Sequence, residues 1–483
     1  MTQETTRQER RNGNGHAPSF LDRTLDQLRA AWEEVAESAR HAVTGAPRPE
    51  LSDDDSERLK ERIHSCIDAV GGEVSARALA AEIGGTYLQL NETGRERFLR
   101  LLATDFGVER AAVDAAVARL GDAPDLDGRR IEEAALRHAL QAPRIVLLSQ
   151  FNGLLEGVKF LVDMRAELLR LRRKDPLFTP LEGDLKELLA YWFDIGFLEL
   201  RRITWDSPAS LLEKLASYEA VHAIESWQDL KKRLESDRRL YAFFHPHMPE
   251  EPLIFVEVAL VDGMADSVQE LLDLDGEKID PRSADTAIFY SISNAQAGLA
   301  GISFGGFLIK RVADDLSAEL KNLKTFATLS PIPGFRRWLA EQGKGNDALL
   351  RREDRKALAT LAPPVDGVAA LPALLDRADW HMDESLNEAL RGPLGHLCAH
   401  YLLEVRRENG RARDPVANFH LTNGARVERL NWMADISAKG LRDSAGLMVN
   451  YRYRLNEIEE NHDAYRKRGR IAASPAVRAL GKG

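Results

Sequence analysis

A glycine-rich segment is the first place where this sequence could support chemistry. Residues 285–330 predict a strand (TAIFYSIS), a loop (NAQAGLAGISFGG), a helix (FLIKRVADDLSAEL) and a second strand that ends in TLS. Four glycines of the loop precede the helix, namely Gly298, Gly301, Gly305 and Gly306. Free N–H groups and the positive dipole end at a helix start favour a phosphate. The glycines therefore either form an anion cradle or, as is more common, only make a tight strand-to-helix turn.

Two polar residues lie at the ends of other predicted elements. Ser330 ends the second strand and is followed by Pro-Ile-Pro-Gly, so the chain leaves the sheet abruptly there, and strand ends of this kind border clefts. His420 lies in NFHLTNGAR, ahead of an Asn-Gly turn. A serine in such a place is usually a turn or capping residue, and a lone histidine is usually packed or exposed. No G-x-S-x-G elbow surrounds Ser330, which argues against a hydrolase nucleophile.

Motifs for nucleotide cofactors and metal ions are absent or incomplete. The loop has neither G-x-x-x-x-G-K-(S/T) nor a clean G-x-G-x-x-G, so ATP and NAD are disfavoured as ligands. His245 and His247 flank a proline at a predicted strand exit. His396 and His400 share a helix face, but no Glu completes an H-E-x-x-H motif. We therefore predict no metal site.

The elements that must position these residues change in type near residue 195. Before about residue 190, apolar side chains recur every three or four positions, which is typical of amphipathic helices. The first such stripe contains Leu21, Leu25, Leu28, Trp32 and Val35. Later, short apolar and β-branched runs such as LYAFFHP and PLIFVEVALV predict strands with helical patterns between them. We predict an α+β fold with a disordered tail (1–18), an all-helical domain (19–194), a mixed-sheet domain with helical insertions (195–466) and a flexible tail (467–483).

Length and composition predict a folded protein and restrict its partners. The 483 residues suffice for two or three domains, and the net charge of −10 provides no cationic field for nucleic acid. No run approaches 18 consecutive apolar residues, so no membrane span is expected. Cys66 and Cys398 are too far apart for a C-x-x-C site, which fits a reducing compartment. The first residues lack a secretory signal, so the expected location is the cytoplasm.

Five segments of the second domain, in this order and at these separations, resemble the malonyl-CoA decarboxylase family. They are HPHMPEEPLIFVEVAL, ADTAIFYSISNAQAGLAGISFGGFLIKRV, LSPIPGFRRWL, DPVANFHLTNGARVERLNWMAD and GLMVNYRYRLNEIEENHDAY. They cover most of residues 240–466, and the helical first 190 residues match the family's architecture more loosely. The resemblance implies a catalytic domain of the GNAT acetyltransferase fold and a helical domain used in self-association. We therefore expect a homo-oligomer, either a dimer or a tetramer.

The resemblance also assigns site residues. The family's catalytic serine and histidine fall on Ser330 and His420. Its loop that binds the pyrophosphate arm of acyl-CoA falls on Ala300, Gly301, Ile302, Ser303, Phe304, Gly305 and Gly306, in agreement with the anion cradle considered above. In the general acetyltransferase pattern (Q/R)-x-x-G-x-(G/A), Ala300 replaces Gln or Arg and Ser303 replaces the first Gly. That departure weakens a transferase interpretation and leaves the role of Ser303 open.

The implied reaction is the decarboxylation of malonyl-CoA to acetyl-CoA and carbon dioxide. Malonyl-CoA carries a carbonyl β to its carboxylate and can lose carbon dioxide to leave a thioester enolate, so no cofactor and no metal is expected. The resemblance implies that Ser330 engages the malonyl carboxylate, as hydrogen-bond partner and formal proton acceptor, and that His420 protonates the enolate carbon. Two alternatives stay open: an acyl-CoA-dependent acyltransferase, and a non-catalytic acyl-CoA sensor or scaffold. Dependence on an added amine would indicate the first, and release of carbon dioxide would exclude the second.

Overall fold

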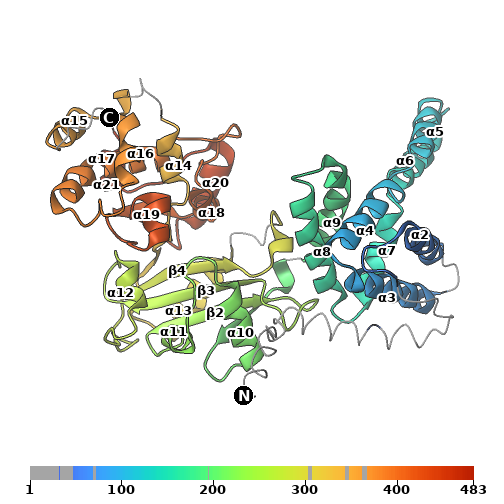
Figure 1. Cartoon of the computed structure of the whole chain (residues 1–483), viewed down its shortest axis with the longest axis horizontal. Coiled ribbons are helices and arrows are strands. Elements are labelled where there is room, and N and C mark those ends of the chain that lie inside the picture. The colour runs from blue at the N-terminus through green and yellow to red at the C-terminus, as the bar shows by residue number, and fades with distance from the viewer. Residues whose placement is uncertain are drawn as a thin grey trace, which may run out of the picture. The chain divides into compact units, whose positions relative to one another are not determined.

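The chain divides into two compact units (Figure 1). A computed structural model describes Trp32 and residues 47–482, apart from 69–71, 194, 303–306, 343–346 and 362–366. The first unit contains residues 1–194 and 296–302, and the second contains residues 195–295 and 303–483. The predicted fold class, a helical region followed by a mixed sheet with helices, is confirmed. Residues 296–302 belong to the helical unit, however, whereas the sequence placed them in the second domain.

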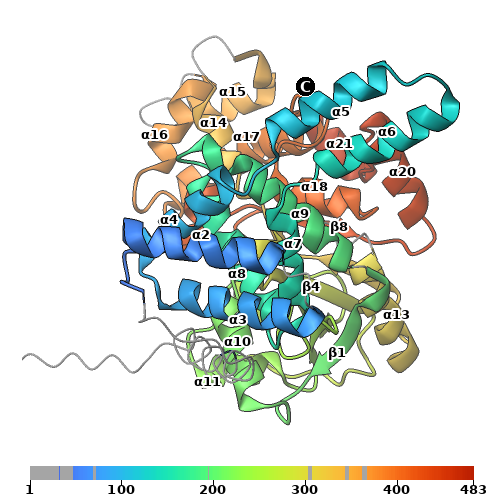
Figure 2. The same ribbon diagram turned by 90° about the vertical axis from the view of Figure 1, so that its right-hand side faces the viewer.

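The helical unit forms because successive segments each carry one apolar face. Its longer helices, seen in Figure 2, are α2 (Asp53–Ile67), α3 (Glu73–Gln89), α4 (Glu92–Thr104), α5 (Arg110–Gly121), α6 (Leu126–Ala139), α7 (Arg144–Gln150), α8 (Gly157–Leu171) and α9 (Thr179–Trp192). Ser52 and Asn91 cap α2 and α4 by accepting a hydrogen bond from a backbone N–H. Trp32 packs on Phe151 and Phe160, with ring centroids 5.6 and 4.9 Å apart. These rings form part of the core of the unit.

The second unit is built on a mixed sheet. The described residues contain the strands β1 (Glu199–Ile203), β2 (Arg238–Phe244), β3 (Ile254–Val261), β4 (Thr286–Asn294), β5 (Thr325–Thr328), β6 (Ser330–Pro331), β7 (Arg426–Asn431) and β8 (Met448–Arg452). They are ordered β1-β2-β3-β4-β5-β8-β6, with β7 beside β8. β4 and β5 are parallel, and α13 (Phe307–Glu319) lies in the connection between them, as a crossover between parallel strands requires.

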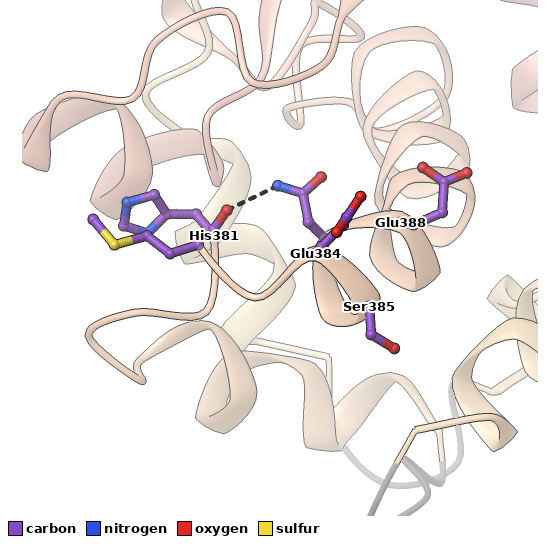
Figure 3. Close-up of a pocket in the computed structure, with 6 residues that line it drawn as sticks. His381, Glu384, Ser385 and Glu388 are labelled. Carbon is purple, nitrogen blue, oxygen red and sulfur yellow. Dashed lines mark hydrogen bonds between the residues drawn. The ribbon is translucent and has the colours of Figure 1, made fainter.

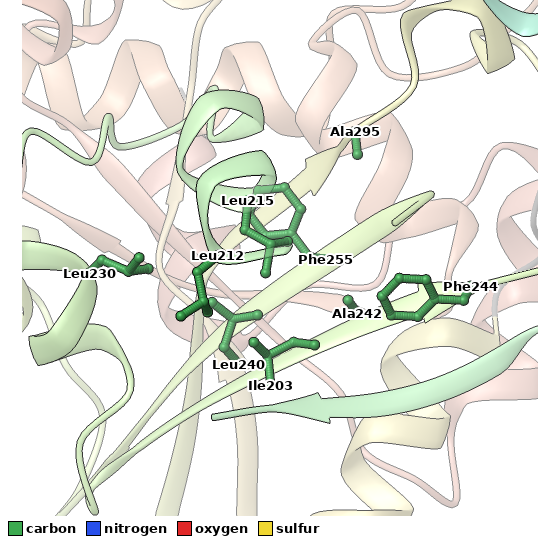
Figure 4. Close-up of a cluster of buried hydrophobic side chains, with 9 residues drawn as sticks. All are labelled: Ile203, Leu212, Leu215, Leu230, Leu240, Ala242, Phe244, Phe255 and Ala295. Atoms are coloured by element: carbon green, nitrogen blue, oxygen red, sulfur yellow. The ribbon is translucent and has the colours of Figure 1, made fainter. Parts of the chain in front are cut away.

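Helices α10 (Ala209–Tyr218) and α11 (Trp227–Arg233) cover one face of the sheet. Figure 4 shows Leu212 and Leu215 of α10 and Leu230 of α11 in a cluster with strand side chains. Leu240 of β2 and Phe255 of β3 point into this cluster, because alternate residues of a strand face the same side. This contact forms an apolar core under β2 and β3.

The pairing of the strands changes at Phe289 of β4. The β4–β5 ladder ends at Phe289 opposite Thr328, and the Leu329 N–H still donates to the Phe289 carbonyl at 3.0 Å. A register shift in the β3–β4 pair occurs at the same level. Beyond it, Ser330 pairs with β8 rather than with β4. The two parallel strands therefore separate at the point where the sequence places Ser330.

Over residues 467–483, where the sequence predicts a flexible tail, the structure forms a last helix. The other helices of the unit are α12 (Val268–Leu272), α14 (Phe335–Ala340), α15 (Arg352–Ala359), α16 (Leu371–Leu375), α17 (Glu384–Leu403), α18 (Pro415–Thr422), α19 (Ala438–Ser444), α20 (Ile458–Arg468) and α21 (Pro475–Gly481). Ser474 caps α21, Val477 is buried, and the Leu480 carbonyl lies 2.6 Å from Nδ1 of His396. A short helix that buries so little has no long apolar period to predict it.

Two further predictions concern the tails and the membrane. The predicted disordered tail, residues 1–18, lies outside the described residues. Among the described helices, none combines the length and the apolar composition that a membrane crossing requires. The expected cytoplasmic location stays a prediction.

Candidate active site

The structure brings Ser330 and His420 together. Ser330 begins β6, where it pairs with Val449 of β8, and His420 lies in the last turn of α18. Both side chains are buried, and Ser330 Oγ lies 3.1 Å from His420 Nε2. Two residues that are 90 positions apart in the sequence therefore make a direct polar contact inside the second unit.

Hydrogen bonds on both sides of the pair orient the two side chains. Ser330 Oγ donates its only hydroxyl proton to Thr328 Oγ1 at 2.8 Å. Toward His420, Ser330 Oγ therefore acts as the hydrogen-bond acceptor. His420 Nδ1 lies 2.8 Å from Tyr453 Oη. When Nε2 carries the proton, Nδ1 is an acceptor, and the Tyr453 hydroxyl satisfies it. The network therefore favours the imidazole tautomer with its proton on Nε2, directed at Ser330.

Burial keeps this imidazole neutral. Tyr451 stacks on the His420 ring, with centroids 4.6 Å apart. Desolvation lowers the pKa of His420 to about 3, because the buried ring cannot solvate a positive charge. Burial also holds the pKa of Tyr453 well above its ordinary value of 10, so its hydroxyl stays protonated. At neutral pH the pair therefore offers a proton at Nε2 and carries no charge.

Asp414 connects the two chain segments that carry the pair. Its Oδ1 caps α18 by accepting from two backbone N–H groups of the helix, at 3.0 and 2.9 Å. Its Oδ2 accepts from the Gly334 N–H at 3.1 Å, four residues after Ser330. Burial raises the pKa of this carboxyl group, and the backbone donors oppose that rise. Asp414 therefore ties the start of the helix that carries His420 to the chain that leaves Ser330.

Strand β8 supports the serine through Thr328. Asn450 Nδ2 donates to the Thr328 carbonyl at 2.8 Å, and its Oδ1 accepts from Asn431 Nδ2 at 2.8 Å. The Tyr451 N–H donates to Thr328 Oγ1 at 3.1 Å. These bonds fix Thr328 and, through its hydroxyl, the orientation of Ser330.

The predicted substrate loop is described only in part. Ala300, Gly301 and Ile302 follow the short helix η4 (Ala297–Leu299) in the helical unit. Gly301 has a φ of +74°, a backbone conformation that favours glycine. The remaining predicted residues lie outside the described residues, namely Ser303, Phe304, Gly305 and Gly306. Their assignment to the loop stays a prediction.

Sequence analysis did not identify Thr328, Asp414 or Tyr453. Tyr453 follows Tyr451 by two positions, and side chains with that spacing share a face of an extended chain. That alternation could have marked both tyrosines as lining one site. An Asp-Pro pair signals a helix start, but the contact of Asp414 with Gly334 spans 80 positions and has no local signature.

Three of the four histidines that we considered as metal ligands make other contacts. His245 and His247 stack on each other, with ring centroids 5.1 Å apart. The two ring nitrogens of His396 lie 2.6 and 3.0 Å from backbone carbonyl oxygens. Within the described ranges, no group of three or more His, Cys, Asp or Glu side chains could hold a metal ion.

Two pockets lie in the second unit. One, of about 740 Å³, lies at the start of α17 and is lined by His381, Met382, Glu384, Ser385, Asn387 and Glu388 (Figure 3). Inside it, Asn387 Nδ2 donates to the His381 carbonyl at 3.0 Å. None of the predicted site residues lines this pocket. A second pocket, of about 480 Å³, includes Tyr453, the residue that contacts His420 Nδ1.

Comparison with known proteins decides the family. The model of the malonyl-CoA decarboxylase C-terminal domain matches residues 196–483, and that of the N-terminal domain matches residues 106–193. The chain belongs to the malonyl-CoA decarboxylase family. The mitochondrial malonyl-CoA decarboxylase of Rattus norvegicus is 39% identical, over 80% of this chain and 81% of its own. That of Anser anser anser is 40% identical, over 79% of each chain.

Solved structures of the malonyl-CoA decarboxylase family have the same fold. The crystal structure of malonyl-CoA decarboxylase from Rhodopseudomonas palustris matches with a TM-score of 0.80 and 41% identity, over 88% of this chain and 99% of that one. The one from Agrobacterium vitis matches with a TM-score of 0.79 and 40% identity, over 88% and 100% of the two chains. Ser330 and His420 therefore lie in the C-terminal domain of a malonyl-CoA decarboxylase fold.

Proposed function

We propose that this protein decarboxylates malonyl-CoA to acetyl-CoA and carbon dioxide, with Ser330 and His420 as its catalytic residues. The observation that carries the proposal is the buried 3.1 Å contact between Ser330 Oγ and Nε2 of a neutral His420. Relatives that match about four fifths of their length are malonyl-CoA decarboxylases by name. A hydroxyl beside a protonated ring nitrogen provides the two groups that this reaction uses.

The chemistry needs one carboxylate contact and one proton. Ser330 engages the malonyl carboxylate, and the bond between that carboxyl carbon and the α-carbon breaks. Its electron pair moves into the thioester to form an enolate, and carbon dioxide leaves. The Nε2–H of His420 then protonates the α-carbon, which gives acetyl-CoA, and the ring regains a proton from solvent. Neutral imidazole is a far stronger acid than the α-carbon of a thioester, so this transfer is favourable, and no cofactor takes part.

The loop of Ala300–Gly306 is the proposed site for the pyrophosphate arm of CoA. It directly follows η4, which in turn follows the end of β4. Its described part contains Gly301 with a left-handed backbone, which allows a close approach of a ligand to the main chain. The loop would hold the nucleotide end of the substrate.

A direct assay tests the proposal. Purified protein is incubated with malonyl-CoA in the presence of EDTA and without added cofactor, and acetyl-CoA and labelled carbon dioxide are measured. We expect both products from the wild-type protein. In Ser330→Ala and His420→Asn, we expect kcat to fall by a factor of about 100 or more. His396→Asn, which alters another buried histidine, is the matched control. Failure to form acetyl-CoA would reject the activity, and CoA release that depends on an added amine would indicate an acyltransferase.

We also propose that the helical unit mediates self-association through α5 and α6. These two helices pack on each other as a hairpin, which Figure 1 shows extending from the other helices of its unit. No side chain of α6 is buried, and Leu126 and Ile131 are 76% and 67% exposed. A second copy of the chain could cover these apolar side chains. Ile131→Glu should therefore lower the molar mass in sedimentation equilibrium, and an unchanged mass would reject this interface.

A further inference from the structure

The helical unit includes the segment that leads into the proposed phosphate loop and forms its first three residues. Residues 296–302 belong to this unit, and η4 packs on α8. Gly298 touches α8 so closely that a Cβ added there would lie 1.8 Å from the Val162 carbonyl oxygen. Leu299 is buried. The main chain of this segment therefore packs directly against the backbone of α8.

One buried arginine joins α8, α9 and this segment. Arg165 of α8 is 1% exposed, and its Nε and Nη2 donate to Glu182 Oε1 of α9 at 3.0 and 2.8 Å. Its Nη2 also donates to the Ala300 carbonyl at 2.8 Å, and its Nη1 donates to the Gly298 carbonyl. Charge-assisted bonds from a planar guanidinium are strong and directional. Arg165 therefore fixes the orientation of two peptide groups of the segment.

Fixing the Ala300 carbonyl also fixes the next N–H. In a trans peptide the C=O and the following N–H point in opposite directions. Because the Ala300 carbonyl points at Arg165, the Gly301 N–H points away from it. Within the described residues this N–H has no hydrogen-bond partner. Gly301 is exposed, so the N–H is available to a ligand.

A lysine of α9 lies beside the same glycine. A Cβ added to Gly301 would lie 3.8 Å from Lys186 Nζ. Lys186 is exposed and follows Glu182 by four positions, so both project from the same face of α9. An ammonium group and an oriented N–H at one exposed turn are the donors that bind a phosphate group.

We propose that the helical unit forms part of the phosphate site of acyl-CoA: Lys186 binds a phosphate, and Arg165 is a positioning residue that orients the Gly301 N–H toward it. This inference rests on the proposed role of the loop in binding the pyrophosphate arm. It gives the helical unit a function in substrate binding, in addition to self-association. It also predicts that these residues discriminate between substrates with and without the nucleotide.

Two substrates distinguish this role from a structural one. Malonyl-pantetheine carries the same thioester and carboxylate as malonyl-CoA but lacks the pyrophosphate and the nucleotide. Loss of one charged contact to phosphate should raise the KM for malonyl-CoA about tenfold in Lys186→Ala. The KM for malonyl-pantetheine should stay within about twofold of wild type, since its binding involves no phosphate. Lys60→Ala, which removes the same charge from α2, should leave both values unchanged.

Arg165→Met has an equally close control. Arg144 is also buried in the helical unit and also combines a carboxylate partner with two backbone carbonyls, those of Leu102 and Ala103. Its hydrogen-bond partners among the described residues are Asp184, Leu102 and Ala103, and none of them belongs to the loop segment. Both arginine variants should lose stability, but only Arg165→Met should raise the KM for malonyl-CoA relative to malonyl-pantetheine. If the ratio of the KM for malonyl-CoA to the KM for malonyl-pantetheine is the same in Arg165→Met and in the Arg144 variant, the proposed role of Arg165 is overturned.

Calorimetric titration with CoA keeps this proposal separate from the proposed function. CoA binding requires no turnover, so it reports the phosphate site even if the protein proves inactive on malonyl-CoA. We expect Lys186→Ala and Arg165→Met to weaken CoA binding about tenfold, and Lys60→Ala to leave it unchanged. CoA affinities equal to that of the wild type in both variants would reject the site, whatever the activity. Absence of turnover by wild-type protein that binds CoA would reject only the proposed activity.

Discussion

The pKa of His420 leads to a prediction about stability at mildly acidic pH. The folded protein holds the pKa of this imidazole at about 3, below its ordinary value of 6.5, because burial disfavours the charged ring. In the unfolded chain the ring is solvated and takes up a proton as the pH falls through 6.5. The unfolded state then binds more protons than the folded state, so the free energy of unfolding decreases as the pH falls.

The size of the effect follows from the two pKa values. At pH 5 the unfolded imidazole is almost fully protonated, 1.5 pH units below its pKa, whereas the folded one is neutral. This difference should lower the free energy of unfolding by about 2 kcal/mol between pH 7 and pH 5. In His420→Gln the titrating group is absent. The free energy of unfolding should therefore fall by about 2 kcal/mol less in this variant than in wild type between pH 7 and pH 5. Other groups contribute equally to both proteins and cancel.

Urea unfolding at the two pH values measures this difference. His138→Gln is the matched control, because solvent reaches that exposed ring in both the folded and the unfolded chain. Histidine labelled at the ring carbons gives a second, direct measurement by NMR. We expect the His420 resonance to keep the chemical shift of a neutral ring down to pH 5. A midpoint between pH 5 and 8, or equal pH dependence in wild type and His420→Gln, would refute the argument from burial.

Three further changes test how the site is held. Asp414→Ala removes the anchor between Gly334 and the helix of His420, so kcat should fall about tenfold or more with little change in KM, as steady-state kinetics would reveal. Tyr453→Phe removes the donor to His420 Nδ1 and should cost about 1 kcal/mol of stability in denaturant unfolding. Gly424→Ala places a Cβ 2.2 Å from a backbone carbonyl at a φ of +79°, and should lower the thermal midpoint by several degrees in calorimetry.

Local sequence patterns predicted the parts of this protein that depend on neighbours along the chain. The apolar periods of the first 190 residues predicted helices, and the short β-branched runs predicted strands, because each reflects the face that one element buries. The Pro-Ile-Pro-Gly that follows Ser330 predicted that the chain leaves the sheet near this residue, and β6 ends at Pro331, although Ser330 begins that strand instead of ending β5. The Asn-Gly after His420 predicted the turn, and Gly424 indeed has a positive φ. The pairing of Ser330 with His420 came from the family resemblance, not from these patterns.

What the sequence could not predict depends on contacts between distant segments. Arg165 and the Ala300 carbonyl are 135 positions apart, and a backbone carbonyl has no residue type that could mark it. The grouping of residues 296–302 with the helical unit could not be predicted for the same reason, because Gly298 and Ala300 contact α8 through main-chain groups. The last helix was missed because its stability comes from packing on α17 and from the bond of Leu480 with His396, rather than from its own pattern.

The partners of His420 explain how a Ser–His pair could serve decarboxylation rather than thioester hydrolysis. In a hydrolase the imidazole takes the serine proton and becomes positively charged, and a carboxylate on its other nitrogen stabilises that charge. Here the hydroxyl of Tyr453 occupies this position, and burial lowers the pKa of the ring. Serine deprotonation is therefore disfavoured, while the Nε2 proton remains available to an enolate.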